Sequence, residues 1–356
     1  MAAKGKTPSS SGSDSGPGSG SGSKGGASSA SSRPSFGDFG QRYALIFAWA
    51  LVIVIFSLAE PDTYFTSGNF ETIFGSQAVL LILALALIIP LTTGDFDLSI
   101  AGVMVLSAMS LAILTVDHGW ALLPAIIVVL AIGLLIGLIN GALVVLLRVD
   151  SFIVTLGIGS IVAGITLWIS DSNTVTGLPA DLSTWVVENR ILGVSLAFWY
   201  GLALTIVLWY VFTYTAIGRR LLFVGRGRNV SRLSGINVGR LRWGALGMSA
   251  LISALAGVVY AGSLGGADPT SGLQFLLPAF AAAFLGATAI RPGRFNPWGT
   301  FIAVYFLISG ITGLQLIGVE SFVQQLFFGG ALVFAVGLGQ LVRRRDIRDE
   351  AAAGAG

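Results

Sequence analysis

Long apolar runs recur along this chain, and they constrain its fold more than any other feature. About 20 apolar residues of α-helix cross the hydrocarbon core of a bilayer, where a helix satisfies its own backbone hydrogen bonds. Roughly ten runs approach that length, near residues 42–59, 73–92, 98–116, 120–147, 152–170, 196–215, 244–264, 273–290, 298–316 and 321–342. Hydrophobic residues make up 54% of the 356 residues and charged residues only 10%, which excludes an ordinary soluble core. The sequence therefore predicts an all-α, polytopic membrane protein with about ten transmembrane helices.

The charged residues are distributed unequally among the loops between these runs. If the N-terminus is cytoplasmic, the outer loops contain one of the 20 basic residues, Arg190, and nine acids. The outer loops are then 60–72, 117–119, 171–195, 265–272 and 317–320, and their acids are Glu60, Asp62, Glu71, Asp117, Asp171, Asp181, Glu188, Asp268 and Glu320. Cytoplasmic loops are enriched in Lys and Arg, so the reverse orientation would break this bias. We expect both termini in the cytoplasm and a multi-pass protein of the cell (plasma) membrane.

The two ends of the chain differ in composition from the apolar region. Residues 1–40 consist mainly of Ser, Gly, Pro and Ala with scattered Lys, and they have no apolar face to bury. We expect them to form a disordered cytoplasmic tail. Residues 41–342 are the expected transmembrane domain, with a long cytoplasmic loop at 216–243, and residues 343–356 form a second cytoplasmic tail.

The sequence offers little for catalysis. The absence of cysteine excludes disulfides, thiolate metal sites and a cysteine nucleophile. Gly5-Lys6-Thr7 lacks the upstream glycine of a phosphate-binding loop. The single histidine, His118, lies in a short outer turn, where we expect it to be solvated. We therefore expect no enzymatic activity, no bound cofactor or metal and no nucleic-acid partner, so that energy for transport comes from a partner or a gradient.

Two carboxylates interrupt the apolar sequence between the second and third runs. Asp95 and Asp97 lie in the stretch Leu91–Gly102, together with the candidate pathway residues Thr93 and Ser99. A carboxylate at the bilayer centre costs about 2.5–3.5 kcal/mol, so both acids are expected to face protein or water. Asp97 fits a helix cap that accepts backbone N–H groups from the first turn of the next helix. The same stretch fits the wall of a transport pathway, and the two interpretations are compatible.

A second unusual stretch is the loop Gly218–Trp243, which contains seven arginines and no acid. Its arginines suit the cytoplasmic side of the membrane and anionic lipid head groups. Its mixed apolar and basic composition also suits a docking element.

A third stretch, Leu285–Thr300, joins the eighth and ninth runs, where Pro292 and Pro297 prevent a continuous helix. Its candidate residues are Gly286, Thr288, Gly293 and Arg294, and its alternative role is only to anchor the topology.

Four motifs in order give the chain a family resemblance. They are Thr93-Gly-Asp-Phe-Asp-Leu-Ser-Ile100, Ser151-Phe-Ile-Val-Thr-Leu-Gly157, Arg232-Leu-Ser-Gly-Ile-Asn-Val238, and Leu285-Gly-Ala-Thr with Gly293-Arg and Trp298-Gly-Thr300. With them, residues 42 to 342 resemble the permease subunits of bacterial ATP-binding-cassette (ABC) importers of the ribose and xylose type, the branched-chain-type permeases. The resemblance implies the fold of a type II ABC importer permease.

The chain departs from the family pattern at several positions. Asp95 stands where glycine is common and Asp150 where proline is common. Gly225-Arg-Gly227 and Val230-Ser231 replace a usual Gly-Gly-Asn and two alanines, and Arg291-Pro292 replaces a usual Phe-Gly. These departures concern docking and substrate choice rather than the class of protein.

The resemblance also implies partners and roles. Two permease subunits, identical or different, would enclose one pathway, a cytoplasmic ABC ATPase would hydrolyse ATP, and an extracytoplasmic binding protein would deliver a monosaccharide. The segment Arg232–Val238 would form a short coupling helix whose Leu233 and Ile236 fill a groove on the ATPase. Its coupling residues are Arg232, Leu233, Ser234, Gly235, Ile236 and Asn237. The alternative is an ion-coupled secondary transporter of a small polar solute, in which Asp95 and Asp97 bind the ion.

The identity of the substrate is not encoded in a motif. Scattered polar groups would read a neutral sugar, and the candidates are Thr92, Thr93, Ser99, Ser107, Asn140, Thr155 and Gln274. Gly133, Gly137 and Gly141 recur at four-residue spacing, which favours close helix packing over ligand contact.

Overall fold

A computed structural model describes residues 36–320 and 322–353 of the chain. The expected disordered tail lies outside the described residues, except that residues 36–40 already belong to the first helix. At the other end, the last helix continues through most of the expected C-terminal tail.

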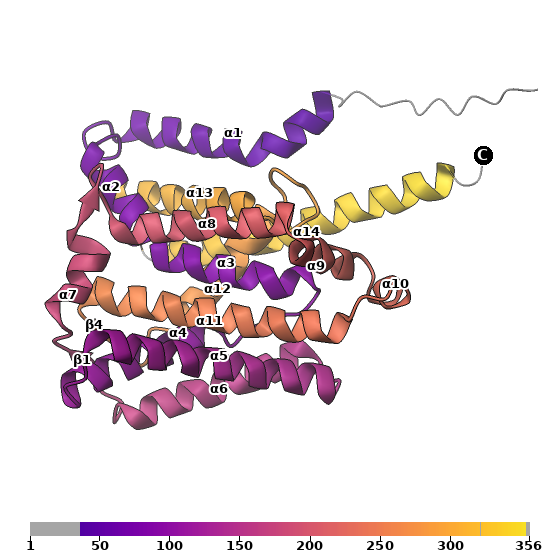
Figure 1. The fold of residues 1–356 in the computed structure, drawn as a ribbon. Coiled ribbons are helices and arrows are strands. Elements are labelled where there is room, and N and C mark those ends of the chain that lie inside the picture. Colours follow the sequence, from indigo (N-terminus) through magenta and orange to yellow (C-terminus); the bar gives the residue numbers. More distant parts are fainter. Residues whose placement is uncertain (1–35, 321, 354–356) are drawn as a thin grey trace, which may run out of the picture.

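The described chain is a bundle of long helices that lie side by side (Figure 1). The helices are α1 Phe36–Ala59, α2 Ser67–Ser76, α3 Ala78–Thr92, α4 Ile100–Ala112, α5 Leu122–Leu146, α6 Ser151–Ile169, α7 Ala180–Ser183, α8 Leu196–Tyr214, α9 Ala216–Arg226, α10 Arg228–Leu233, α11 Val238–Leu264, α12 Leu273–Gly286, α13 Pro297–Leu316 and α14 Phe322–Ala353. Two π-helical turns are η1 Ile113–Asp117 and η2 Thr184–Glu188. Short antiparallel pairs join β1 Val175–Thr176 to β4 Gly266–Ala267 and β2 Arg190–Ile191 to β3 Val194–Ser195.

Each of the ten apolar runs is helical, but not every helix is long enough to cross a membrane alone. In the described part of the chain, seven helices have the length and composition of a span, and an eighth span results if α2 and α3, bent by 41°, are counted together. The apolar helix α12 (Leu273–Gly286) and the apolar part of α14 (Phe322–Gly337) are shorter than a full span. The fold is therefore an all-α, polytopic membrane protein, and the count of ten spans stays a prediction.

The helices form a buried core and an outer layer. Every residue of α3 is buried. In the most apolar part of α11, 78% of the residues are buried, whereas in that part of α1 only 6% of the residues are buried. A helix that is apolar on all sides suits either lipid or a protein core. The core therefore consists mainly of α3 with its neighbours α11, α12 and α13, while α1, α5, α6 and α8 present apolar side chains outward.

Glycines allow α5 to approach α11 closely, as their spacing predicted. A Cβ atom added at Gly137 would lie 2.6 Å from the Cβ of Ala250 and 2.7 Å from the carbonyl oxygen of Leu246. Additions at Gly133 and Gly141 would overlap Ala254 and Trp243 of the same helix. The packing role of these three glycines is confirmed.

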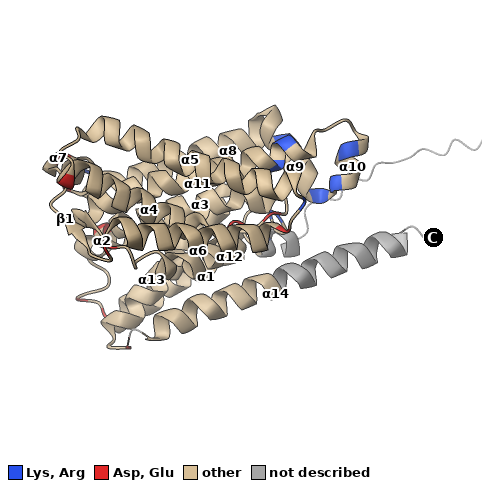
Figure 2. Cartoon of the chain, turned by 90° about the horizontal axis from the view of Figure 1, so that it is seen from below, with Lys and Arg blue, Asp and Glu red and all other residues tan. Residues whose placement is uncertain are grey.

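The two ends of the bundle differ in charge. The helices α9 and α10, the beginning of α1 and the far end of α14 lie at one end, and α2, α7 and the β1–β4 pair lie at the other (Figure 1). Figure 2 shows Lys and Arg on α9 and α10 and an acidic residue at α7. We refer to these as the basic end and the acidic end.

Candidate functional site at the basic end

The segment Thr93–Ser99 connects α3 to α4, and its polar side chains are buried. We refer to it as the polar segment. The helix α3 ends because Gly94 adopts a positive φ of 78°, after Thr93 and Gly94 donate N–H bonds back to Pro90 and Leu91. Thr93, Asp95, Asp97 and Ser99 are all buried. A buried non-helical segment must find partners for its backbone and its charges, and three neighbouring elements provide them.

Asp95 is paired with two arginines of the long loop. Arg242, on the first turn of α11, donates from Nε to Oδ2 at 2.8 Å and from Nη2 to Oδ1 at 2.6 Å. Arg228, the first residue of α10, donates from Nη2 to Oδ1 at 2.9 Å. The side chain of Asp95 is only 1% exposed, against 14% for Arg242 and 37% for Arg228. The forked contact and the second cation compensate the burial of this carboxylate.

Asp97 is held without a cation among the described residues. Its Oδ1 accepts hydrogen bonds from the N–H of Ser99 at 3.1 Å and from Ser99 Oγ at 2.6 Å, and Asn140 Nδ2 donates to the same Oγ at 2.8 Å. Ser99 is the N-cap residue of α4, so the expected bond from Asp97 to an N–H of the first helical turn is not formed. Asp97 instead fixes the residue immediately before the helix.

The N-terminus of α6 satisfies the backbone of the polar segment. Ser151 Oγ accepts the N–H of Phe96 at 3.0 Å, and Thr155 Oγ accepts the N–H of Leu98 at 3.0 Å. Thr155 Oγ in turn donates to the carbonyl of Ser151 at 2.8 Å. Asp150 caps α6 by accepting the N–H of Phe152 at 2.8 Å. The motif that begins at Ser151 thus has a structural reason, because two hydroxyls four residues apart face the polar segment.

The long loop folds differently from the expected coupling helix. The expectation of a helix over Arg232–Val238 is wrong, because α10 covers Arg228–Leu233 and the chain turns at Ser234–Asn237. Gly235 has φ of 78°, its N–H bonds the carbonyl of Arg232, and the N–H of Ile236 bonds the carbonyl of Ser231. This pattern is a Schellman stop, which favours glycine. Asn237 then caps α11 by accepting the N–H of Arg240, so the motif encodes the end of one helix and the start of the next.

The coupling candidates of this turn lie on the surface of the basic end. Leu233 is 90% exposed, and Arg232, Ser234, Gly235 and Asn237 are also exposed. Ile236 is partly buried. The described residues therefore leave the leucine at the last position of this short helix uncovered.

The turn between α12 and α13 is organised by an asparagine that the sequence analysis missed. Asn296 Nδ2 donates to the carbonyls of Gly286 at 3.2 Å and Ala289 at 3.0 Å, and its Oδ1 accepts the N–H of Gly299 at 2.7 Å. A Cβ atom added at Gly286 would lie 2.5 Å from the backbone nitrogen of Thr300. Thr288 donates to the carbonyl of Leu285, and Gly293 has φ of 78°. Gly286, Thr288 and Gly293 therefore shape the turn.

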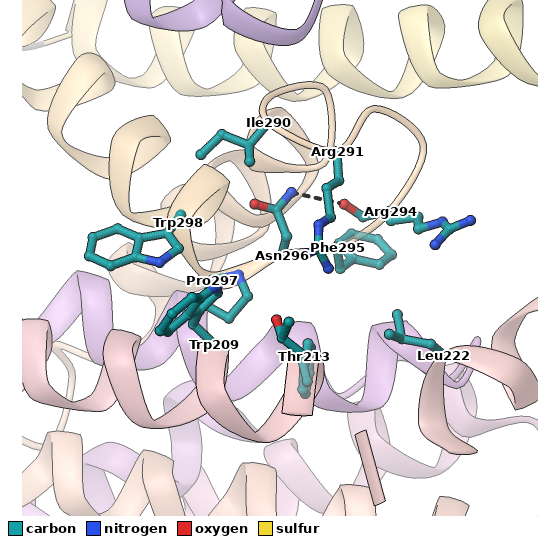
Figure 3. A pocket seen from close by; sticks show the side chains of 11 residues that line it. Trp209, Thr213, Leu222, Ile290, Arg291, Arg294, Phe295, Asn296, Pro297 and Trp298 are labelled. Atoms are coloured by element: carbon teal, nitrogen blue, oxygen red, sulfur yellow. Dashed lines mark hydrogen bonds between the residues drawn. The ribbon is translucent and has the colours of Figure 1, made fainter. Parts of the chain in front are cut away.

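A cavity of about 70 Å³ opens beside this turn (Figure 3). Its walls include Trp209 of α8, Leu222 of α9 and Trp298 of α13, and its rim includes Arg291 and Arg294. Arg294 is exposed. Partial burial, followed by the positive charges of Arg226 and Arg291, lowers the pKa of Arg294 below its ordinary value. Three arginines therefore gather at this part of the basic end.

The structure brings most of the predicted residues into one continuous region. Thr93 is bonded to Asp95, Ser99 to Asp97, and Thr155 to the backbone of the same segment. The polar segment thus links these residues into one network, and α10 joins it to the exposed coupling turn. Phe96 stacks on Phe284, whose ring lies against Phe295 of the α12–α13 turn with centroids 5.3 Å apart. Among the candidate sugar contacts, Gln274 is exposed on α12, outside this network.

The polar segment also has partners whose contacts the sequence did not predict, namely Arg228, Arg242, Asn140 and Ser151. The sequence predicts Asn140 only as a sugar contact. A signal for the arginines is Asp95 itself, because a carboxylate inside an apolar run requires a cation and the loop Gly218–Trp243 is rich in them.

These features define a polytopic helical membrane protein in which a basic surface is connected to a buried polar segment. The profile of the family described as "Branched-chain amino acid transport system / permease component" matches residues 69–336. The chain belongs to this family of ABC importer permeases.

Curated relatives cover nearly the whole chain. The D-allose transport system permease protein of Escherichia coli K12 is 29% identical over 310 residues, covering 87% of this chain and 95% of the relative. The ribose import permease protein of the same strain is 31% identical over 295 residues, covering 82% and 91%. Its xylose transport system permease protein is 27% identical over 366 aligned residues, covering 86% and 93%. No solved structure matches the chain.

Proposed function

We propose that this protein forms the translocation pathway of a sugar importer and works as one of two permease subunits, identical or different. The similarity to allose, ribose and xylose permeases over more than four-fifths of the chain supports a monosaccharide as the substrate. An extracytoplasmic binding protein would deliver the sugar, and a cytoplasmic ABC ATPase would provide the energy. In this arrangement the chain itself hydrolyses no ATP and binds no cofactor.

The basic end is the proposed cytoplasmic face. The arginine-rich loop, the beginning of α1 and the far end of α14 lie together there, which supports two cytoplasmic termini and an even number of spans, of which we propose ten. Anionic lipid head groups would contact the arginines that surround this face.

The observation that carries the proposal is the exposed turn after α10. Leu233 is 90% exposed at the end of a short helix, beside the exposed Arg232 and Ser234. Val230 is 59% exposed and lies three residues before Leu233 on α10, so the two side chains form a small apolar face on a basic surface, and such a face suits a groove on a partner. The segment Arg232–Asn237 is therefore the proposed contact with the ATPase.

Leu233→Asp tests this contact. The charged side chain should prevent the ATPase from co-purifying with the permease and should abolish sugar uptake, while the permease still reaches the membrane. The matched control is Leu192→Asp. Leu192 is 86% exposed but lies in the turn between β2 and β3, which packs on α2 of the acidic end, so this variant should retain the ATPase. Normal ATPase retention by Leu233→Asp would exclude this docking role.

The ion-coupled alternative is less well supported. Asp95 is already occupied by two arginines, which leaves it unsuited to bind a coupling cation. Uptake that persists in Leu233→Asp and is abolished by an ionophore would favour that alternative.

A further inference from the structure

Two arginines of the long loop make the direct polar connection between the proposed docking turn and the buried polar segment. Arg228 donates from Nη2 to the carbonyl oxygens of Thr93 and Gly94 at 3.0 and 2.9 Å, as well as to Asp95. Arg242 holds both oxygens of the same carboxylate. The polar segment is thus bound to the loop through its side chain and through its backbone.

The loop also contacts the end of α3 through close packing of its backbone. A Cβ atom added at Gly225, near the C-terminus of α9, would overlap the carbonyl oxygen of Thr92. At this position the loop backbone touches the last residue of the most buried helix. A displacement of α9 and α10 toward the membrane therefore meets α3 and the polar segment directly.

The opposite side of the polar segment is attached to other helices. Ser151 and Thr155 of α6 accept its N–H groups, and Asn140 of α5 binds Ser99 at the start of α4. Asp95 is bound on the loop side, and the residues from Phe96 to Ser99 are bound on the helix side. The segment therefore lies between a surface element and three helices of the bundle.

The geometry of α10 suits the transmission of movement. Arg228 is the first residue of this helix and Leu233 is the last. Because one helical residue rises about 1.5 Å, roughly 7.5 Å separate the proposed ATPase contact from the arginine that holds Asp95. A helix of about one and a half turns, such as α10, is short enough to move as a rigid unit.

We propose that Asp95 is a positioning residue that, through Arg228 and Arg242, couples displacement of the docking turn to the polar segment and hence to α4 and α6. This inference rests on the proposed docking of the ATPase at Leu233. Neither arginine needs to touch the sugar or the nucleotide in this role.

The test is sugar transported per ATP hydrolysed, measured in liposomes that contain the permease, its ATPase and its binding protein. Asp95→Asn keeps the size of the side chain but removes the charge that holds both arginines. ATP hydrolysis should continue, whereas sugar transported per ATP should fall on the order of tenfold, the scale of typical coupling energies. Stimulation of ATP hydrolysis by the loaded binding protein should be lost in parallel.

Matched variants separate coupling from folding. Arg240 lies two residues before Arg242 on α11 and is exposed, and the described residues place no carboxylate within 4.0 Å of it. The Arg240→Gln variant should therefore transport sugar normally. Arg242→Lys keeps the charge but loses the forked contact, so it should give an intermediate ratio. If Asp95→Asn does not reach the membrane, Arg228→Gln provides the same test from the more exposed side of the pair.

The outcomes are distinguishable. A normal sugar-to-ATP ratio in both Asp95→Asn and Arg228→Gln, with the ATPase bound, overturns this inference and leaves the docking role intact. Retention of the ATPase by Leu233→Asp overturns the docking role instead. A loss of ATPase association in Asp95→Asn would show that Asp95 acts by shaping the docking surface, and it would also overturn the inference.

Discussion

Asp95 and Asp97 lie two residues apart in one buried segment, yet they are accommodated in different ways. Asp95 is held by two arginines, whereas Oδ1 of Asp97 accepts hydrogen bonds from the hydroxyl and the N–H of Ser99. Removing one partner of a buried ion pair typically costs 3–5 kcal/mol, about twice the cost of losing a neutral hydrogen bond. The two acids therefore give the segment one connection to a charged surface and one to the neutral interior.

At the residue scale, Thr155 provides a sharp test of how the polar segment is held. Thr155→Val preserves the shape of the side chain but leaves the N–H of Leu98 without its acceptor at a partly buried position. We expect a loss of about 1–3 kcal/mol in the free energy of unfolding. The thermal unfolding midpoint in detergent should fall accordingly. Thr155→Ser keeps the hydroxyl and should lie closer to the original protein, so equal midpoints for Val and the original residue would contradict this role.

Sequence reasoning identified the residues of this segment but not their partners. The acids stood out because carboxylates are rare in apolar runs, and Thr155 belonged to a recognisable motif. Arg228 is more than 130 positions away from Asp95 along the chain. Nothing in local spacing indicates which of seven arginines approaches a given acid, because that choice depends on how α3, α10 and α11 pack.

At the element scale, the position of the short helix shows how local signals were misread. The motif from Arg232 to Val238 was treated as one helical unit, although Gly235 lies in its centre. In the structure that glycine takes a left-handed conformation and ends α10, while Asn237 starts α11. The sequence contains both capping signals, because a glycine such as Gly235 favours the end of a helix and an asparagine such as Asn237 favours the start of the next one. Apolar runs, by contrast, located every long helix.

The close approach of α5 and α11 gives a prediction for a helix pair. Gly137→Leu would place a side chain into the backbone of Leu246 and Gly247, so the two helices must separate. Overpacking of this kind typically costs 1–3 kcal/mol or more. We expect a lower unfolding midpoint and less monodisperse protein in size-exclusion chromatography. Gly164→Leu on α6 is the control, because open space surrounds Gly164. Similar losses in both variants would show that lipid contact of the larger side chain, not packing against α11, is responsible.

At the scale of the whole molecule, the separation of charge predicts the orientation in the membrane. The sequence contains no cysteine, so single cysteines can be introduced without removing any other. Ser234→Cys at the basic end should react with a membrane-impermeant maleimide only after the cells are opened, whereas Thr174→Cys, near β1, should react in intact cells. Both positions are exposed. The reverse pattern of labelling would show that the basic end faces outward and that the charge argument fails for this protein.

The enclosed position of α3 has a consequence for biosynthesis. Its contacts include α8, α11, α12 and α13, all of which the ribosome makes later. Membrane helices insert first and associate afterwards. Lipid must therefore surround this helix temporarily, and neighbours from the second half of the chain must displace that lipid before the core is complete. Ribosomes that stall before α13 would release a chain in which the side of α3 that α13 covers is still an outer surface.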